Sequence, residues 1–163
     1  MNLATALPVL LPGAVAWAED VARGALRDGD PLSPVDLETA RRVGVRLPER
    51  IRVRVVESLP VPDDPMLREA ALQAGLLGPG MIGLTLGYAV FMRQGRVDTR
   101  LISHESRHVH QYETHGGIAA FLPAYLTQVA SVGYASAPFE LDAREHEIEA
   151  RLAIGGETLR RRK

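Results

Sequence analysis

The chain has 163 residues, of which 46% are hydrophobic and 24% charged, the balance of an ordinary globular protein. A chain of this length buries one core, so we expect a single domain over residues 1–163. Its net charge of -1 gives no electrostatic attraction to nucleic acid or to an anionic membrane, and we expect neither as a partner. The absence of cysteine excludes disulfides, thiolate metal sites and cysteine nucleophiles, and it suits a reducing cytoplasm.

The N-terminal segment combines features of a secretory signal with features that argue against one. Leu3 to Ala18 is mostly apolar and ends in small residues, so a signal peptide ending near Ala18 is conceivable. However, no Lys or Arg precedes Arg23, and Pro8 and Pro12 interrupt the apolar run. No stretch reaches the roughly 18 uninterrupted apolar residues that a membrane span needs. We therefore expect a cytoplasmic protein.

The sequence pattern of the first half of the chain predicts three helices and one strand. The strand is Glu49 to Glu57, where Ile51, Val53 and Val55 alternate with arginines and are expected to form a buried face. Three helices are predicted from their start and stop signals. They are Gly13 to Arg27, stopped by Asp28-Gly29-Asp30; Ser33 to Gly44, with a Ser-Pro-Val-Asp start; and a short helix that Asp64-Pro65 opens and Gly75 closes.

The second half predicts two strands and then helices. The apolar runs 82–86 and 88–92, split by Gly87, indicate paired or bent strands at a sheet edge. The helices that follow are recognised by their caps, glycines and prolines. They are a helix from Asp98 or Thr99 to about His115, ended by Gly116-Gly117; Ile118 to Val132, with a break at Pro123; and Pro138 to about Ile154.

This order of elements favours an α+β fold, with a small, mostly antiparallel sheet and the late helices packed on one side of it. We expect residues 1–80 to supply the N-terminal helices and the first strand. Residues 81–154 would supply the edge strands and the helices of the site, and residues 155–163 a solvated tail.

A metal-binding pattern lies on the helix that begins near Asp98. His104-Glu105-Ser106-Arg107-His108 places two histidines four residues apart, so both imidazoles lie on one helix face and can bind one ion. Glu105 is turned away from the ion but can reach a water bound to it. Zinc lowers the pKa of such a water towards about 7, and the carboxylate can take its proton. The pattern therefore predicts a zinc site with Glu105 as general base.

A catalytic zinc site usually has a third protein ligand, which here must be Asp, Glu or His. The helix from Pro138 offers several acids. We favour Glu140, which lies in the first turn, where the helix dipole stabilises an anion. Glu145, one turn later, is the second candidate, and Asp142, on another face, is the third.

The region from Gly83 to Arg144 resembles a bacterial group of small zincin-type domains. The resemblance rests on His104-Glu105-x-x-His108-Val109-x-Gln111-Tyr112-Glu113, Gly116-Gly117, Phe121-Leu122, Tyr125, Gly133-Tyr134 and Ala137-Pro138-Phe139-Glu140-x-x-Ala143. These motifs are similar to the metallopeptidase (core) domains associated with extracellular contractile injection systems. The resemblance implies a glutamate-zincin arrangement, with His104, His108 and Glu140 as zinc ligands and Glu105 as general base.

Two departures from that pattern concern the surroundings of the ligands. Larger glutamate-zincins carry an Asp four residues after the third ligand, which orients a ligand imidazole; here that position is Arg144, so the acceptor must come from elsewhere. Many zincin motifs also have uncharged residues where this chain has Arg107, and a hydrophobe where it has His110. Neither change removes a ligand.

We expect a zinc-dependent metallopeptidase that hydrolyses a peptide or protein substrate. Tyr134, close before the Glu140 helix, is a candidate hydrogen-bond donor to the oxyanion. The alternative is a metal-binding but catalytically inactive protein-interaction module on a zincin scaffold.

Overall fold

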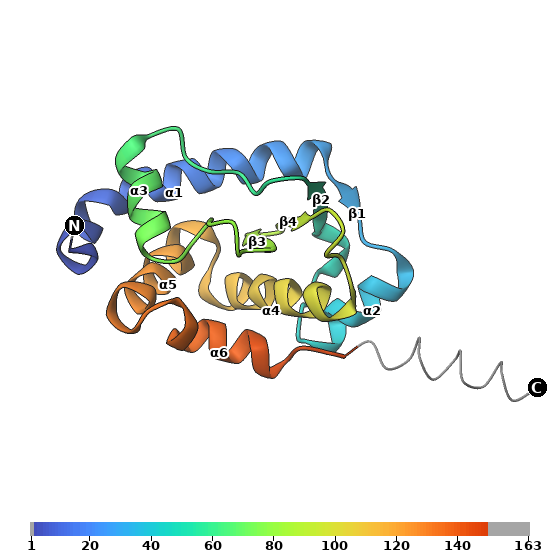
Figure 1. Cartoon of the computed structure of the whole chain (residues 1–163). Coiled ribbons are helices and arrows are strands. Elements are labelled where there is room, and N and C mark those ends of the chain that lie inside the picture. Colours follow the sequence, from blue (N-terminus) through green and yellow to red (C-terminus); the bar gives the residue numbers. More distant parts are fainter. Residues whose placement is uncertain (1, 150–163) are drawn as a thin grey trace, which may run out of the picture.

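A four-stranded mixed sheet lies between helices in the computed structural model, which describes residues 2–149 (Figure 1). The strands are β1 (Asp30–Pro31), β2 (Arg52–Val56), β3 (Gly83–Leu86) and β4 (Ala89–Arg93). The helices are α1 (Leu3–Asp28), α2 (Pro34–Arg42), α3 (Pro65–Gln73), α4 (Thr99–His115), α5 (Ile118–Val132) and α6 (Pro138–Glu145), with short 3-10 turns η1 (Pro48–Arg50) and η2 (Tyr134–Ser136). The expected α+β class is confirmed.

The strand order is β1-β2-β4-β3, with one parallel pairing inside the sheet. β1 and β2 pair antiparallel, as do β3 and β4, whereas β2 and β4 run parallel with Arg52 opposite Ala89. The paired strands around Gly87 are therefore confirmed, with β3 at the edge and β4 in the interior. Gly87 has φ +65°, a left-handed conformation that a tight turn between the two strands requires and that glycine adopts without strain.

Both faces of β4 are buried, which explains why helices cover the sheet on two sides. Val90 and Met92 pack with Leu101, Ile102 and Val109 of α4. Ala89 and Phe91 point to the other face, where they pack with alanines of α1 and with Leu122 of α5. The late helices therefore do not all lie on one side: α5 helps α1 to cover the second apolar face of the sheet.

Helix α1 begins ten residues earlier than expected and runs through both prolines. Asn2 caps it, with its side-chain oxygen accepting a hydrogen bond from the Thr5 N–H at 3.3 Å. Pro8 and Pro12 are exposed, so their missing donors leave no backbone group buried without solvent. Apolar residues at helical spacing hold this first half of α1 on the protein; they are Leu3, Leu7, Leu10, Ala14 and Trp17.

Three further expectations differ from the structure. Helix α5 is continuous through Pro123, without the expected break. Helix α6 ends at Glu145, because the next residues turn back onto α4, where the Ile148 N–H donates to Ser103 Oγ at 2.8 Å. The expected end at Ile154 and the tail 155–163 lie outside the described residues. Val55 is 55% exposed rather than buried, since the cluster on the α4 face of the sheet includes Ile51 and Val53 but does not reach it.

Three predicted helix starts, those of α2, α3 and α4, are confirmed by their capping hydrogen bonds. Ser33 Oγ accepts from the Asp36 N–H at 3.2 Å, and Asp64 accepts from the first two N–H groups of its helix. Asp98 Oδ1 accepts from the Leu101 N–H at 2.8 Å, which fixes the first turn of α4. Within the described residues no helix is both long enough and apolar enough to cross a membrane.

Candidate metal centre

Helix α4 presents the two pattern histidines to the interior of the protein. The rings of His104 and His108 lie on one face of the helix with their centroids 4.9 Å apart, in an edge-to-face arrangement. His108 is buried and His104 nearly so. This orientation follows from the four-residue spacing together with the burial of that face against α5 and α6.

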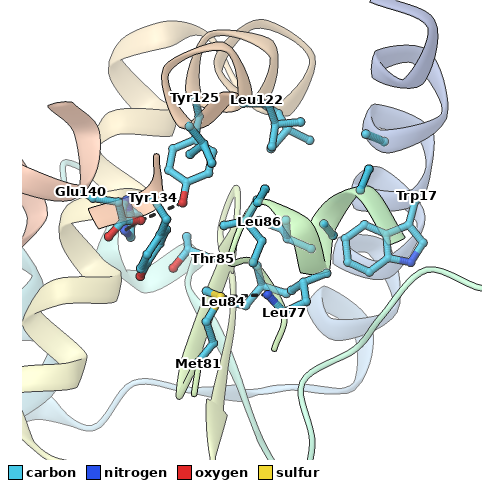
Figure 2. A pocket seen from close by; sticks show the side chains of 18 of the residues that line it. Trp17, Leu77, Met81, Leu84, Thr85, Leu86, Leu122, Tyr125, Tyr134 and Glu140 are labelled. Carbon is cyan, nitrogen blue, oxygen red and sulfur yellow. Dashed lines mark hydrogen bonds and ion pairs between the residues drawn. The ribbon is translucent and has the colours of Figure 1, made fainter. Parts of the chain in front are cut away.

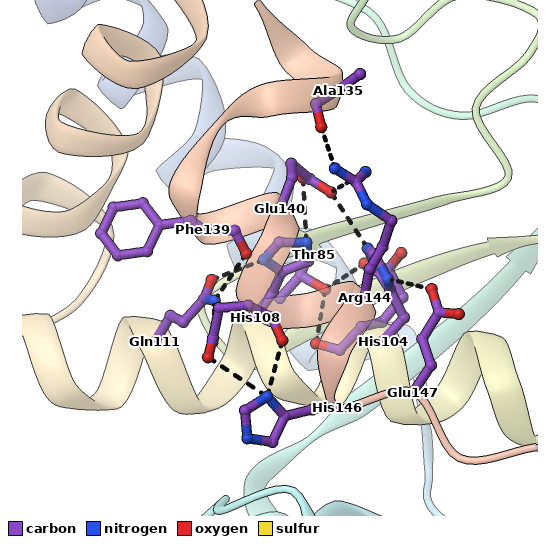
Figure 3. A network of polar contacts seen from close by, with 12 residues as sticks. Thr85, His104, His108, Gln111, Ala135, Phe139, Glu140, Arg144, His146 and Glu147 are labelled. Atoms are coloured by element: carbon purple, nitrogen blue, oxygen red, sulfur yellow. Dashed lines mark hydrogen bonds and ion pairs between the residues drawn. The ribbon is translucent and has the colours of Figure 1, made fainter. Parts of the chain in front are cut away.

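Glu140 of α6 completes the group. Its Oε1 lies 3.2 Å from His108 Nε2, its Oε2 lies 3.4 Å from His104 Nε2, and the carboxylate is 2% exposed (Figure 3). One ligand atom from each of the three residues lies within 4.8 Å of the others. Ligand atoms bound tetrahedrally to zinc are separated by about 3.3 Å, given metal–ligand bonds of about 2.0–2.1 Å. The spacing of the three side chains therefore fits a small divalent cation.

The carboxylate of Glu140 has one oxygen without a hydrogen-bond donor. Tyr125 donates its hydroxyl to Oε1 at 2.8 Å, but Oε2 is buried and accepts no hydrogen bond from the described residues. A buried carboxylate oxygen without a donor destabilises a fold, whereas a bound cation would compensate it. This oxygen faces His104, which is where a shared metal ion would bind.

The other two candidate ligands lie elsewhere. Glu145 is exposed at the end of α6. Asp142 forms a bidentate ion pair with Arg107, at 2.8 and 3.1 Å, and so connects α6 to α4. The structure therefore brings Glu140, and neither Glu145 nor Asp142, to the two histidines.

Each candidate ligand histidine is held from behind through Nδ1. His104 Nδ1 lies 2.9 Å from Glu147 Oε1, and His108 Nδ1 lies 2.8 Å from Gln111 Oε1. Both contacts leave Nε2 directed at Glu140. Glu147, three residues after Arg144, is therefore placed where an acid could orient the His104 ring.

The three unusual residues near the motif have structural partners. Arg144 lies 3.9 Å from Glu140 Oε2 and donates to the carbonyl of Ala135. Arg107 donates to the carbonyl of Val43 at 2.8 Å in addition to its pair with Asp142. His110, on another face of α4, lies 2.8 Å from the Gly44 carbonyl and is half-buried. None of the three side chains removes or displaces a member of the His-His-Glu group.

The members of this group stabilise one another's charged forms. Burial alone would raise the pKa of Glu140, but the imidazoles of His104 and His108 beside it hold that pKa well below its usual range. Burial alone would lower the pKa of His104, but the neighbouring carboxylates of Glu140 and Glu105 raise it to about 9. The pKa of His108 is raised through the same two acids despite its burial.

Glu105 lies on α4 beside the group and points towards β3. It is 5% exposed, and Thr85 Oγ1 donates to its Oε2 at 2.7 Å. Gly83 of β3 is so close that a Cβ there would lie 2.6 Å from Glu105 Cδ, so the carboxylate occupies the space of a missing side chain. Thr85 and Gly83 together fix the position of this carboxylate.

Tyr134 lies at the same place, on the η2 turn before α6. Its half-buried ring lines the cavities that His104 and Glu105 also line (Figure 2). Burial and the negative charges of Glu140 and Glu105 raise the pKa of its hydroxyl. The hydroxyl therefore keeps its proton at neutral pH and can donate a hydrogen bond.

No protein-family model, no curated protein and no solved structure matches this chain. A functional assignment therefore depends on the sequence and on the geometry of the site.

Sequence reasoning missed four residues that support the site. Tyr125 and Thr85 act through contacts between elements, for which the sequence contains no periodic signal. Glu147 lies beyond the end of α6, and the expectation of a helix continuing to Ile154 concealed its role. A search for acceptors of a second histidine nitrogen would have found Gln111, which lies three residues after His108 on the same helix.

Proposed function

We propose that this protein is a zinc-dependent peptidase of the zincin type, as the resemblance to the core domains of contractile injection systems implies. One observation carries the proposal. A buried His-His-Glu group, with ligand-atom spacing suited to zinc, lies beside the carboxylate of Glu105, which is not one of the candidate ligands. Zinc bound there would supply a Lewis acid that polarises a carbonyl and makes water acidic.

The residues of the chain have distinct roles in this reaction. Glu105 accepts a proton from the attacking water and then donates it to the leaving amine. Tyr134, protonated at neutral pH, donates a hydrogen bond to the oxyanion that develops on the substrate carbonyl. Thr85 and Gly83 hold the Glu105 carboxylate in place, which avoids the cost of ordering it in the transition state.

A second function, a metal-binding interaction module without turnover, is favoured by one contact. Thr85 Oγ1 donates a hydrogen bond to a Glu105 oxygen at 2.7 Å, and this bond makes that oxygen a weaker acceptor for a proton from water. In such a module the metal would stabilise the fold and Glu105 would be dispensable.

The two functions differ in their response to Glu105→Gln. We expect the wild-type protein, purified without chelator or a His-tag, to hold about one zinc per chain by elemental analysis, and His104→Ala to lose it. Glu105→Gln should keep the zinc, because no ligand is removed. Its turnover of a peptide mixture should fall by about 100-fold or more, because the general base is removed. The control is Glu145→Gln, an exposed acid of α6, which should retain both zinc and turnover.

Other results would contradict the peptidase. Equal turnover of Glu105→Gln and wild type excludes the proposed base. A protein that holds zinc, cleaves nothing and loses stability on His108→Ala, but not on Glu105→Gln, is the interaction module.

A further inference from the structure

An apolar cavity of about 150 Å³ opens beside the candidate metal centre (Figure 2). Helices α1, α3 and α5 and strand β3 form its walls. The polar side chains that line it belong to the site or lie directly beside it; they are Thr85, Glu105, Tyr112, Tyr125, Tyr134 and the members of the centre. The remaining lining is almost entirely aliphatic or aromatic and includes Leu77, Met81, Leu84, Leu86, Leu122 and Leu126.

Helix α1 supplies one wall of this cavity. Leu3, Leu7, Leu10, Ala14 and Trp17 follow one another at helical spacing, line the cavity and are only half-buried. Such a stripe on a helix normally packs fully against a core. Here it faces a space that connects to reactive groups, so the first 80 residues contribute to the site as well as to the fold.

The size of the cavity limits what it can bind. A cavity of about 150 Å³ lined by Leu, Ile and Phe binds benzene, so this cavity can hold one ring or one branched aliphatic side chain. A polar or charged side chain would lose its hydration there without finding partners away from the site. If an apolar side chain enters the cavity from the site, the peptide backbone to which it is attached stays beside Glu105 and the His-His-Glu group.

Another part of the surroundings of the centre is more polar. A second cavity, of about 440 Å³, shares His104, Glu105 and Tyr134 with the first. Charged side chains line much of it, among them Arg96, Asp98, Arg100, Arg144 and Glu147, together with glycines of the 75–83 loop and the apolar Met81, Ile82 and Leu101. An apolar side chain would meet charged groups there, so we expect the first, apolar cavity to determine the preference.

We propose that the cavity binds a large apolar side chain, such as that of Phe or Leu, of the substrate residue next to the bond that is cleaved. The position of that bond rests on the peptidase function proposed above. Filling the cavity with a substrate side chain removes apolar surface from water on both partners. We expect about a 10- to 100-fold higher kcat/KM for a peptide with Phe there than for its Gly counterpart.

The test uses short synthetic peptides that differ only in carrying Phe, Leu, Ala, Gly or Lys at one position. Ala130→Phe fills the cavity from α5, and it should reduce cleavage next to Phe by at least about tenfold while sparing cleavage next to Ala. Ala124→Phe, on the same helix but exposed and outside the cavity, is the matched control and should leave the preference unchanged. Should Ala130→Phe fail to fold by circular dichroism, Ala71→Phe fills the same cavity from α3.

Trp17 provides a readout that does not require turnover. It is the single tryptophan of the chain and lines the cavity, so its fluorescence reports on occupancy. In zinc-loaded Glu105→Gln, the Phe peptide should cause a saturable change in Trp17 fluorescence. The Gly and Lys peptides should cause none, and the Phe peptide should cause none when Ala130→Phe is added to this variant.

The two readouts separate the two proposals. Cleavage without preference, or a preference that the filled cavity leaves intact, overturns the cavity proposal and leaves the peptidase standing. Side-chain-selective binding at Trp17 without any cleavage by the wild type overturns the peptidase and supports the cavity as the binding site. The absence of any Trp17 response to the Phe peptide overturns the cavity proposal.

Discussion

Glu147 and Gln111 determine which nitrogen each histidine of the site presents. Gln111 donates its side-chain N–H groups to the Phe139 carbonyl, at 3.0 Å, and to Asp142, at 2.8 Å. Its oxygen is therefore free to accept from His108 Nδ1 at 2.8 Å. Glu147 accepts from His104 Nδ1 in the same way. In their neutral form both rings then direct the Nε2 lone pair at the space beside Glu140, which is the form that a metal needs.

Removing Glu147 should therefore weaken metal binding without removing a ligand. We expect Glu147→Ala to lower zinc affinity by about 10- to 100-fold, because the His104 ring loses both its orientation and the charge that increases its basicity. Competition with a chromogenic chelator measures this change. Glu145→Ala, two residues away and exposed, is the control. An affinity equal to that of the wild type would show that Glu147 does not orient His104.

The close approach of β3 to α4 is the contact between elements on which the site depends most. A side chain at Gly83 would overlap the Glu105 carboxylate, and Thr85, two residues further along β3, donates to the same carboxylate. Both residues face α4 because side chains two apart on a strand point the same way. The edge strand therefore acts as a positioning element for the proposed base.

Gly83→Ala should separate the base from the metal centre. The new Cβ, 2.6 Å from Glu105 Cδ, must push the carboxylate aside, and a displacement of about 1 Å can lower a rate about 100-fold. Zinc content should stay the same, since the three atoms nearest to the new Cβ all belong to Glu105, which is not a candidate ligand. Turnover and elemental analysis of the same sample test both statements.

The control for this substitution is Gly24→Ala in α1, where an added Cβ meets nothing within 4 Å. It should leave turnover unchanged and stabilise the helix by about 0.5–1 kcal/mol. Full activity of Gly83→Ala would mean that the Glu105 carboxylate functions in another position.

The elements were predictable where a local signal defines them. The caps Ser33, Asp64 and Asp98 could be recognised because each acts within its own first turn. The three helix errors arise because tertiary packing overrides a local signal. Pro8, Pro12 and Pro123 are tolerated inside helices, and the chain after Glu145 leaves the helix to contact α4.

The sequence predicted the reactive groups of the candidate site but not the residues that hold them in place. Helical spacing places His104 and His108 together, and the first-turn position favours Glu140, the acid that lies beside them in the structure. Thr85, Glu147 and Tyr125 come from other elements, and pairing between elements leaves no trace in a single sequence. The apolar cavity could not be predicted for the same reason. In the sequence, the apolar stripe of α1 looks the same as a helix face that packs against a core.

At the scale of the whole molecule, the site joins segments from both ends of the chain. Helix α4 provides the proposed base and two candidate ligands, and strand β3 holds that base in place. Helix α6 provides the third candidate ligand, and α1 with α5 encloses the adjoining cavity. Stability and metal binding are therefore linked, since a metal that binds the folded chain alone stabilises all of these contacts together.

This linkage predicts opposite pH trends with and without metal. In chelator-treated protein His104 has a pKa of about 9, above its ordinary value of 6.5, so its ion pair with Glu140 contributes stability that is complete below about pH 6.5 and lost as the pH rises through about 9. The loss is at most about 3 kcal/mol. Zinc requires neutral histidines, so the stabilisation that it adds increases over the same range. Thermal unfolding with chelator and with zinc should therefore give curves that diverge as pH rises. In His104→Ala the stabilisation by zinc should vanish, whereas the trend without metal should weaken but persist, because His108 still pairs with Glu140 and its pKa is also raised. Parallel curves in the wild type would contradict a metal centre at His104, His108 and Glu140.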